Sequence, residues 1–143
     1  MKVCQLCAVD FTLKKFLLPL IDGQLDNGDE VIAVCSEGEY VRGMREDGYV
    51  INTIPIARSI HPLKHLNSIW KLYWYFSRES FDVVHVHTPV AALVGRIAAY
   101  LARVPFVVYT AHGFYFHDDM GFFKRKFHII LEKFAGLLTD LLF

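Results

Sequence analysis

Residues 82–89 of the chain read DVVHVHTP, and this stretch decides the fold. Asp82–His87 combines three valines with two histidines over six residues, which is typical of a short buried strand. It leads into an apolar, small-residue segment from about Val90 to Ala102, which has the length and periodicity of a helix. A buried strand followed by a helix is the repeating unit of a parallel α/β sheet.

The same unit recurs along the whole chain. Further strands are predicted at Val3–Val9, Glu30–Cys35, Val50–Ile56, Phe106–Thr110 and Thr139–Phe143. Further helices are predicted at Leu13–Leu25 with Thr12 as N-cap, Glu39–Asp47, Leu63–Arg78 and Phe122–Gly136. The pattern therefore predicts a doubly wound parallel sheet, Rossmann-like, in a single domain over residues 1–143. Because the chain stops inside an apolar strand, we expect this domain to be truncated before a further one.

An open parallel sheet binds its ligand outside the carboxyl ends of the strands, where the strand order reverses. We expect the order 3-2-1-4-5, which places that crevice between the first and fourth strands. The bordering loops are Asp10–Thr12, His87–Pro89 and Ala111–Asp119, with Ala57–His65 at the same edge. The first loop has no glycine and none of the patterns of dinucleotide sites or phosphate-loop NTPases, so neither class is predicted.

Composition narrows the function classes further. Fifteen basic and fifteen acidic residues cancel, so nothing indicates nucleic-acid binding. The apolar share of 54% indicates a sheet buried on both faces, an apolar surface for a partner, or both. Neither a signal peptide nor an apolar run of membrane-spanning length is found. Cys4 and Cys7 lie three apart on a strand and point to opposite faces, so we predict buried thiols in a reducing cytoplasm.

Two histidines on the fourth predicted strand are candidate site residues. His85 and His87 lie two apart and therefore share one face. We interpret His85 as a packed core residue. For His87, which ends the strand before Thr88, packing and a position in the crevice both stay open. Because no carboxylate or thiolate is placed to complete a zinc set, no metal site is predicted.

The densest candidate segment is Thr110–Asp119, which reads TAHGFYFHDD. His112 directly follows the fifth strand, and Gly113 permits a turn with positive φ. A histidine there can donate a hydrogen bond to a sugar hydroxyl or to a developing charge. Phe114 and Tyr115 offer flat apolar faces of the kind that stack on sugar rings.

Positive charge gathers at two places. Arg58, His61, Lys64 and His65 either attract a phosphate or belong to a solvated loop. The Phe122–Gly136 helix interleaves basic residues with phenylalanine and isoleucine. Such a helix either lies on an anionic membrane surface or packs its apolar stripe on its own sheet. Both alternatives stay open at each place.

Four segments, in order, resemble one known family. They read FLLPLI at 16–21, IPIARSI at 54–60, DVVHVHTP at 82–89 and YTAHGF at 109–114. Together they are similar to the N-terminal, acceptor-side domain of the family-four retaining glycosyltransferases, which have two Rossmann-like domains (the GT-B architecture). The similarity is closest to enzymes of capsular, exopolysaccharide and lipid-linked oligosaccharide assembly.

The resemblance implies a hexosyltransferase-type enzyme that needs no metal or cofactor. It would move a sugar from a nucleotide-sugar donor to a glycan or lipid-linked acceptor with retention of configuration. It implies that His112 lies at the cleft near the transferred sugar, as the catalytic residue. With the loops above, the candidate substrate-binding residues are Asp10, Phe11, Thr12, Arg58, His87, Thr88, Gly113, Phe114 and Tyr115. The family's first loop is often rich in glycine, and here Asp10–Thr12 departs from that pattern.

The resemblance also implies a C-terminal domain that holds the nucleotide-sugar and carries a Glu-x7-Glu pair. Glu132 and Asp140 show a similar spacing, which we interpret as coincidence. Without that domain we expect the chain to be inactive, in the cytoplasm or at the inner face of the membrane. Two alternatives are a stand-alone flavodoxin-like module that binds a small ligand, and one half of a split glycosyltransferase that docks a separate C-terminal subunit.

Overall fold

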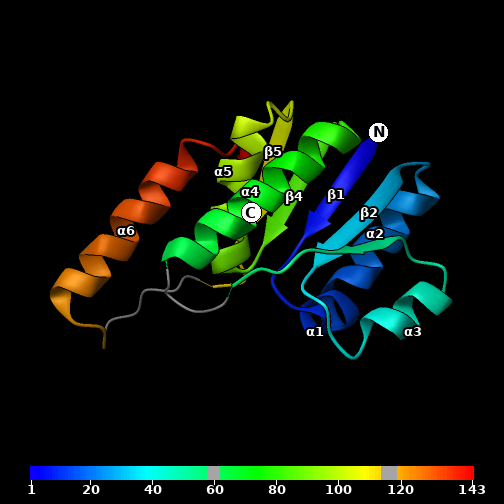
Figure 1. Cartoon of the computed structure of the whole chain (residues 1–143), viewed down its shortest axis with the longest axis horizontal. Coiled ribbons are helices and arrows are strands. Elements are labelled where there is room, and N and C mark those ends of the chain that lie inside the picture. Colours follow the sequence, from blue (N-terminus) through cyan, green and yellow to red (C-terminus); the bar gives the residue numbers. More distant parts are fainter. Residues whose placement is uncertain (58–61, 114–118) are drawn as a thin grey trace.

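All strands in the described part of the chain run in one direction, as expected where helices separate them. The computed structural model describes residues 1–57, 62–113 and 119–143. Its strands are β1 (Lys2–Leu6), β2 (Glu30–Cys35), β3 (Ile51–Thr53), β4 (Val83–His87), β5 (Phe106–Thr110) and β6 (Leu141–Leu142). They lie in the order β3-β2-β1-β4-β5-β6 (Figure 1). This confirms the predicted order and places β1 beside β4, where the order reverses.

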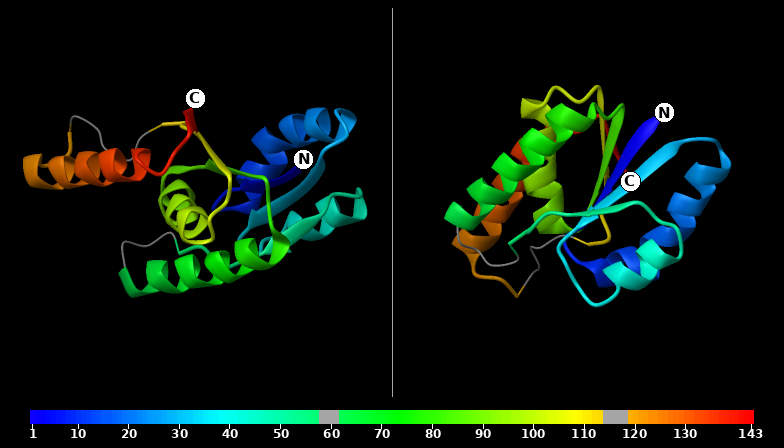
Figure 2. Two further views of the ribbon diagram at one scale, coloured as in Figure 1. Left: turned by 90° about the horizontal axis from the view of Figure 1, so that it is seen from above. Right: turned by 45° about the vertical axis from the view of Figure 1, so that its right-hand side comes forward.

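Helices cover both faces of the sheet (Figure 2). They are α1 (Asp10–Thr12), the π-helical turn η1 (Leu13–Leu17), α2 (Leu18–Asp26), α3 (Val41–Glu46), α4 (Pro62–Glu79), α5 (Pro89–Leu101) and α6 (Phe122–Gly136). One core cluster lies under α4 and α5, where Phe76 and Ala98 join Leu6 and Val86. A second, smaller cluster lies under η1, α2 and α3. The doubly wound fold class is therefore confirmed.

The three cysteines are divided between the two core clusters, which lie on opposite faces of the sheet. Cys4 belongs to the core under α4 and α5, whereas Cys7 and Cys35 belong to the core on the other face. All three are free and buried, as predicted for Cys4 and Cys7. Burial raises the pKa of each thiol, that of Cys35 to about 12, so the thiols stay protonated and act as small apolar groups.

The first helical segment begins earlier than the sequence predicts. Leu13 N donates to Val9 O, so the helical hydrogen bonds start one turn before the expected position. Val9 has the extended backbone of an N-cap, and Thr12 has helical angles (φ −62°, ψ −43°). Thr12 is therefore inside a helical segment that runs from Asp10 to Asp26, and its predicted role as N-cap is wrong.

Four strands are shorter than predicted: β4 begins at Val83 rather than Asp82, β6 covers Leu141–Leu142 rather than Thr139–Phe143, and in β1 and β3 the chain leaves the ladder early. β1 ends at Leu6 rather than Val9, since the chain turns through Ala8 into α1. β3 ends at Thr53 rather than Ile56, and Pro55 next in line has no N–H to offer a ladder. Ile54 N still donates to Cys35 O, so the segment continues alongside β2 as irregular chain.

A buried arginine links helix α6 to α5. Arg96, fully buried on α5, donates from Nη2 to Glu132 Oε1 of α6 at 2.9 Å. Its guanidinium also lies 4.4 Å from the ring centroid of Tyr109, and its Nε donates to Ala92 O. The rest of α6 extends outward beyond α5 (Figure 1), and Ala135 is its one buried residue among those described.

Candidate functional site

The structure brings three histidines together at the carboxyl ends of β4 and β5. His85 and His87 share one face of β4, as predicted, with ring centroids 4.1 Å apart. His112, two residues after β5, stacks on His87 with a centroid distance of 5.5 Å and an interplanar angle of 30°. His87 Nδ1 and His112 Nε2 are 3.3 Å apart. For His87 and His112, this confirms the prediction that the loops after β4 and β5 lie at the same edge of the sheet.

The three rings differ in exposure. His112 is exposed, whereas His87 is 1% exposed and lies beneath it. Of the two positions left open for His87, the structure shows the packed one, and a ligand in the crevice would meet His112 first. Direct substrate contact by His87 stays a prediction.

Burial keeps the two strand histidines neutral. Removal from water lowers the pKa of His85 to about 4 and that of His87 to about 3, with smaller contributions from the neighbouring histidines. His85 Nε2 lies 2.8 Å from Thr110 Oγ1, so its hydrogen bond stays within the core. This confirms His85 as a packed core histidine. In this site the exposed ring of His112 therefore lies against the neutral, buried ring of His87, with the neutral ring of His85 next to that.

Gln5 on β1 is a member of this site that the sequence did not predict. Its Oε1 lies 2.8 Å from His87 Nε2, and its Nε2 donates to Gln24 Oε1 on α2 at 2.8 Å. Gln5 is fully buried. The available signal was a glutamine inside an apolar strand that is covered on both faces, where a polar side chain needs a partner.

The first loop has a structural role that is visible in its contacts. Asp10 Oδ2 accepts from Tyr40 N at 2.8 Å and Oδ1 accepts from Phe11 N at 2.9 Å, so this carboxylate holds the β2–α3 connection. The ring of Phe11 is half exposed and lies 6.1 Å from that of Tyr40. Thr12 is half-buried within the helical segment. Substrate contact by these three residues stays a prediction.

Two loop residues have unusual backbone angles. Thr88, the N-cap of α5, has φ +64° and ψ 140°, which is a strained conformation for a β-branched residue. Its Oγ1 accepts from Ala8 N at 3.4 Å across the β1–β4 junction. Gly113 has φ +144°, which confirms the predicted positive-φ turn after His112. Strain of this kind clusters at functional sites, and here it borders the histidines.

Several predicted residues lie outside the described part of the chain. These are Arg58, Phe114 and Tyr115 of the candidate set, together with His61. Lys64 and His65 are described and lie in the first turns of α4.

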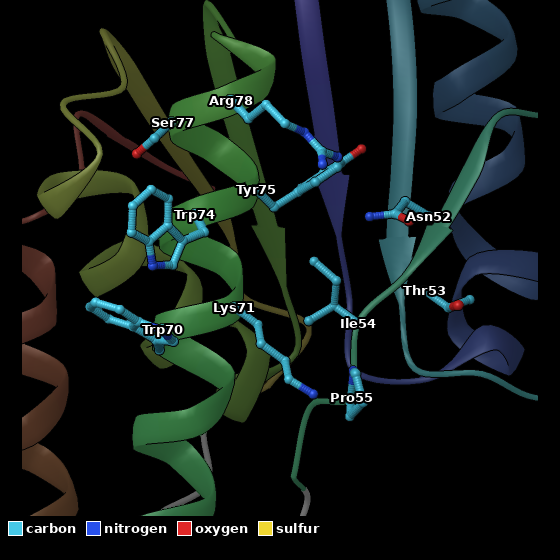
Figure 3. A pocket seen from close by; sticks show the side chains of 10 residues that line it. All are labelled: Asn52, Thr53, Ile54, Pro55, Trp70, Lys71, Trp74, Tyr75, Ser77 and Arg78. Carbon is cyan, nitrogen blue, oxygen red and sulfur yellow. The ribbon is translucent and has the colours of Figure 1, made fainter.

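A separate groove of about 710 Å³ lies between β3 and α4 (Figure 3). Its lining residues are Asn52, Thr53, Ile54, Pro55, Trp70, Lys71, Trp74, Tyr75, Ser77 and Arg78. In Figure 3 Lys71, Tyr75 and Arg78 point from α4 toward β3. None of the described candidate residues lines this groove. It is therefore distinct from the histidine site.

Other groups that the sequence raised have structural partners. Glu132 pairs with Arg96, and the Asp140 carboxylate accepts from Val107 N at 2.7 Å. Both contacts support the interpretation of their spacing as coincidence. Within residues 1–57, 62–113 and 119–143, no three histidine, cysteine, aspartate or glutamate side chains are grouped so as to hold a metal ion.

The curated proteins similar in sequence include two glycosyltransferases of bacterial polysaccharide assembly. A galactosyltransferase of Escherichia coli, named UDP-Gal:alpha-D-GlcNAc-diphosphoundecaprenol alpha-1,3-galactosyltransferase, is 32% identical over 77% of this chain and 29% of its own length. The capsular polysaccharide biosynthesis glycosyltransferase CapM of Staphylococcus aureus is 30% identical over 82% of this chain and 31% of its own length. The chain thus spans about a third of the length of these curated relatives.

Solved structures share the fold. The UDP-GlcNAc 2-epimerase of Methanocaldococcus jannaschii superposes on all of this chain and 39% of its own, with a TM-score of 0.73 and 17% sequence identity. At that identity the likeness concerns the fold alone. The model of Glycosyltransferase Family 4 matches residues 15–141, which is most of the sequence. The chain therefore belongs to Glycosyltransferase Family 4, as the resemblance implied.

Proposed function

We propose that the protein to which this chain belongs transfers a sugar from a nucleotide-sugar donor to a glycan or lipid-linked acceptor, with retention of configuration. The observation that carries the proposal is the contact of His112 with His87 at the β1–β4 reversal point, in a chain of this family. Two curated relatives support it, because one name specifies a UDP-sugar and a diphosphoundecaprenol-linked sugar and the other specifies capsular polysaccharide biosynthesis.

In this proposal the domain supplies the acceptor wall of the cleft. His112 is exposed and its ring stacks on the neutral ring of His87. The ring can therefore contact a sugar hydroxyl or the charge that develops on the leaving group. The nucleotide-sugar is a substrate, and no cofactor or resident metal is proposed. A second domain would provide the other wall and most contacts to the nucleotide.

The test uses the protein as its gene encodes it. We expect it to form a glycosylated product from a UDP-sugar panel and a lipid-diphosphate-linked acceptor, as measured by mass spectrometry, with the anomeric configuration read by NMR. His112→Ala should lower kcat by about a hundredfold or more. The melting temperature should change little, because the ring is exposed. Unchanged turnover would remove His112 from the chemistry, and ligand binding without any product would favour the stand-alone binding module.

We further propose that α6 lies on an anionic membrane surface, which suits a lipid-linked acceptor. Five of its apolar side chains are exposed, those of Phe122, Phe123, Phe127, Ile130 and Phe134, and so is that of Leu137 directly after the helix. Its basic residues are Lys124, Arg125, Lys126 and Lys133. A helix with this composition binds by burying apolar area in the headgroup region and by attraction to anionic lipids. Among residues 1–57, 62–113 and 119–143, none of the helices has the length and hydrophobicity of a membrane-spanning segment.

Vesicle flotation tests the membrane contact. We expect binding to vesicles that contain anionic phosphatidylglycerol, weaker binding to neutral vesicles, and further weakening at high salt. Phe123→Glu, on the exposed side of α6, should abolish the binding. Leu25→Glu is the control, because Leu25 is an exposed apolar residue on α2, away from α6. Equal loss in both variants would contradict a role for α6.

A further inference from the structure

A line of hydrogen-bonded side chains runs beneath His112. It starts at Gln24 on α2, passes through Gln5 on β1 and His87 on β4, and ends at His112. The three links measure 2.8, 2.8 and 3.3 Å between the bonded atoms. Gln5 and His87 are 0% and 1% exposed, so water does not replace these partners. Each atom in the middle of the line must therefore match the donor or acceptor character of its neighbour.

The hydrogen bond between Gln5 and Gln24 determines which atom donates and which accepts in the other two hydrogen bonds. The Gln5 amide nitrogen donates to Gln24 Oε1, which leaves the Gln5 carbonyl oxygen facing His87. A carbonyl oxygen can only accept, so His87 Nε2 must carry a proton. His87 is neutral, because burial lowers its pKa to about 3. A neutral imidazole protonated at Nε2 has a lone pair at Nδ1, and the facing His112 Nε2 must then donate.

We infer that Gln5 is a positioning residue that, through His87, fixes His112 as the tautomer protonated at Nε2. The remaining ring nitrogen, His112 Nδ1, is then the atom available to a substrate. When His112 is neutral, Nδ1 accepts a hydrogen bond from a hydroxyl; when His112 is protonated, it donates one. The meeting with a sugar hydroxyl rests on the proposed function, whereas the tautomer is a property of the chain itself.

His85 provides the internal comparison. It is also a buried, neutral histidine on the same face of β4, yet its hydrogen bond goes to Thr110 Oγ1 and not into the line. Thr110→Val therefore removes one buried hydrogen bond beside the line without breaking any of its links. Gln5→Met keeps a side chain of similar length but removes the amide, and with it the hydrogen bonds of Gln5 to Gln24 and to His87.

Histidine NMR on the 143-residue chain, labelled with ¹⁵N, reads the tautomers directly. At a pH near 8, long-range ¹H–¹⁵N correlations should show His87 and His112 each protonated at Nε2. In Gln5→Met, His112 should become a mixture of both tautomers, and in Thr110→Val it should stay unchanged. Protonation of both rings at Nδ1 in the wild type would mean that the line runs in the opposite direction and would overturn the inference. So would an unchanged His112 in a folded Gln5→Met.

A kinetic measurement on the protein as its gene encodes it separates this inference from the proposed function. Gln5→Met should lower kcat about tenfold or more relative to Thr110→Val, with KM little changed, because a misdirected His112 loses part of its acid–base contribution. Fixed tautomers in a protein without sugar transfer would refute the proposed function and leave the positioning role intact. Equal kcat in the two variants would refute the catalytic part of the inference.

Discussion

Replacing Gly95 with alanine tests how closely α5 packs on β1 and β4, on the face of the sheet opposite the His85 and His87 side chains. A Cβ at this position would lie 2.8 Å from Val86 Cγ1, and closer still to Leu6 Cδ2. Carbon atoms in ordinary contact are about 3.5–4.0 Å apart, so the helix or the strand side chains must shift by about 1 Å. Overpacking of this kind lowers the free energy of unfolding by about 1–3 kcal/mol.

Gly23 on α2 provides a matched control. It is also a glycine within a helix, but a Cβ there would meet nothing within 4 Å. Alanine should favour either helix by roughly 0.5–1 kcal/mol, because glycine loses more backbone freedom on folding. Gly23→Ala should therefore stabilise the chain. The difference between the two variants contains the packing cost alone, about 1–3 kcal/mol.

Urea unfolding followed by far-UV circular dichroism measures this difference from the two midpoints. Since α5 begins directly after the His87–Thr88 loop, its distance from the sheet also sets where that loop lies. Gly95→Ala is expected to be the less stable variant. If its free energy of unfolding equalled that of Gly23→Ala, α5 would not approach the sheet as described and the loop geometry would lose its support.

Three further predictions concern the stability of the folded chain. Glu132→Ala removes the carboxylate from buried Arg96 and should lower the free energy of unfolding by about 1–3 kcal/mol in urea, while an unchanged value would mean that water replaces it. Thr88→Gly and Thr88→Ala both remove the hydroxyl that accepts from Ala8 N, but only glycine relieves the positive φ, so the glycine variant should be the more stable of the two by about 1 kcal/mol; equal stabilities would argue against strain. Below about pH 6.5 the unfolded chain protonates His85 and His87 before the folded chain does, so stability should fall toward pH 5, by up to about 1.4 kcal/mol per pH unit for each ring. His85→Gln should reduce that slope in urea titrations.

Much of the fold followed from local signals. Glu30–Cys35, Phe106–Thr110 and Phe122–Gly136 have the bounds predicted for them, because the apolar period sets their length and an aspartate, proline or glycine directly precedes each one. The order of the strands followed from the alternation of strands and helices and from the handedness of their connections. These features depend on residues that are near each other in the sequence.

Contacts between distant residues explain what the sequence did not predict. Thr12 looked like an N-cap, yet Asp10 is bonded to Tyr40, thirty positions away, and the helix begins before it. Gln5 shows its role only once β1 is paired with β4, which brings it opposite His85 in the register. The polar partner of His87 lies 82 residues earlier in the chain. No local pattern carries such information.

The site is visible as a departure from the rule that governs the rest of the sheet. Strands covered on both faces are expected to be apolar throughout, and Gln5, His85 and His87 break that rule on the same face of two neighbouring strands. Burying three polar side chains costs free energy unless each finds a partner, and here each does. A fully apolar face would fold at least as well, so folding alone does not account for these residues. Their position at the β1–β4 reversal, directly under the exposed His112, is the place where a parallel sheet binds its ligand.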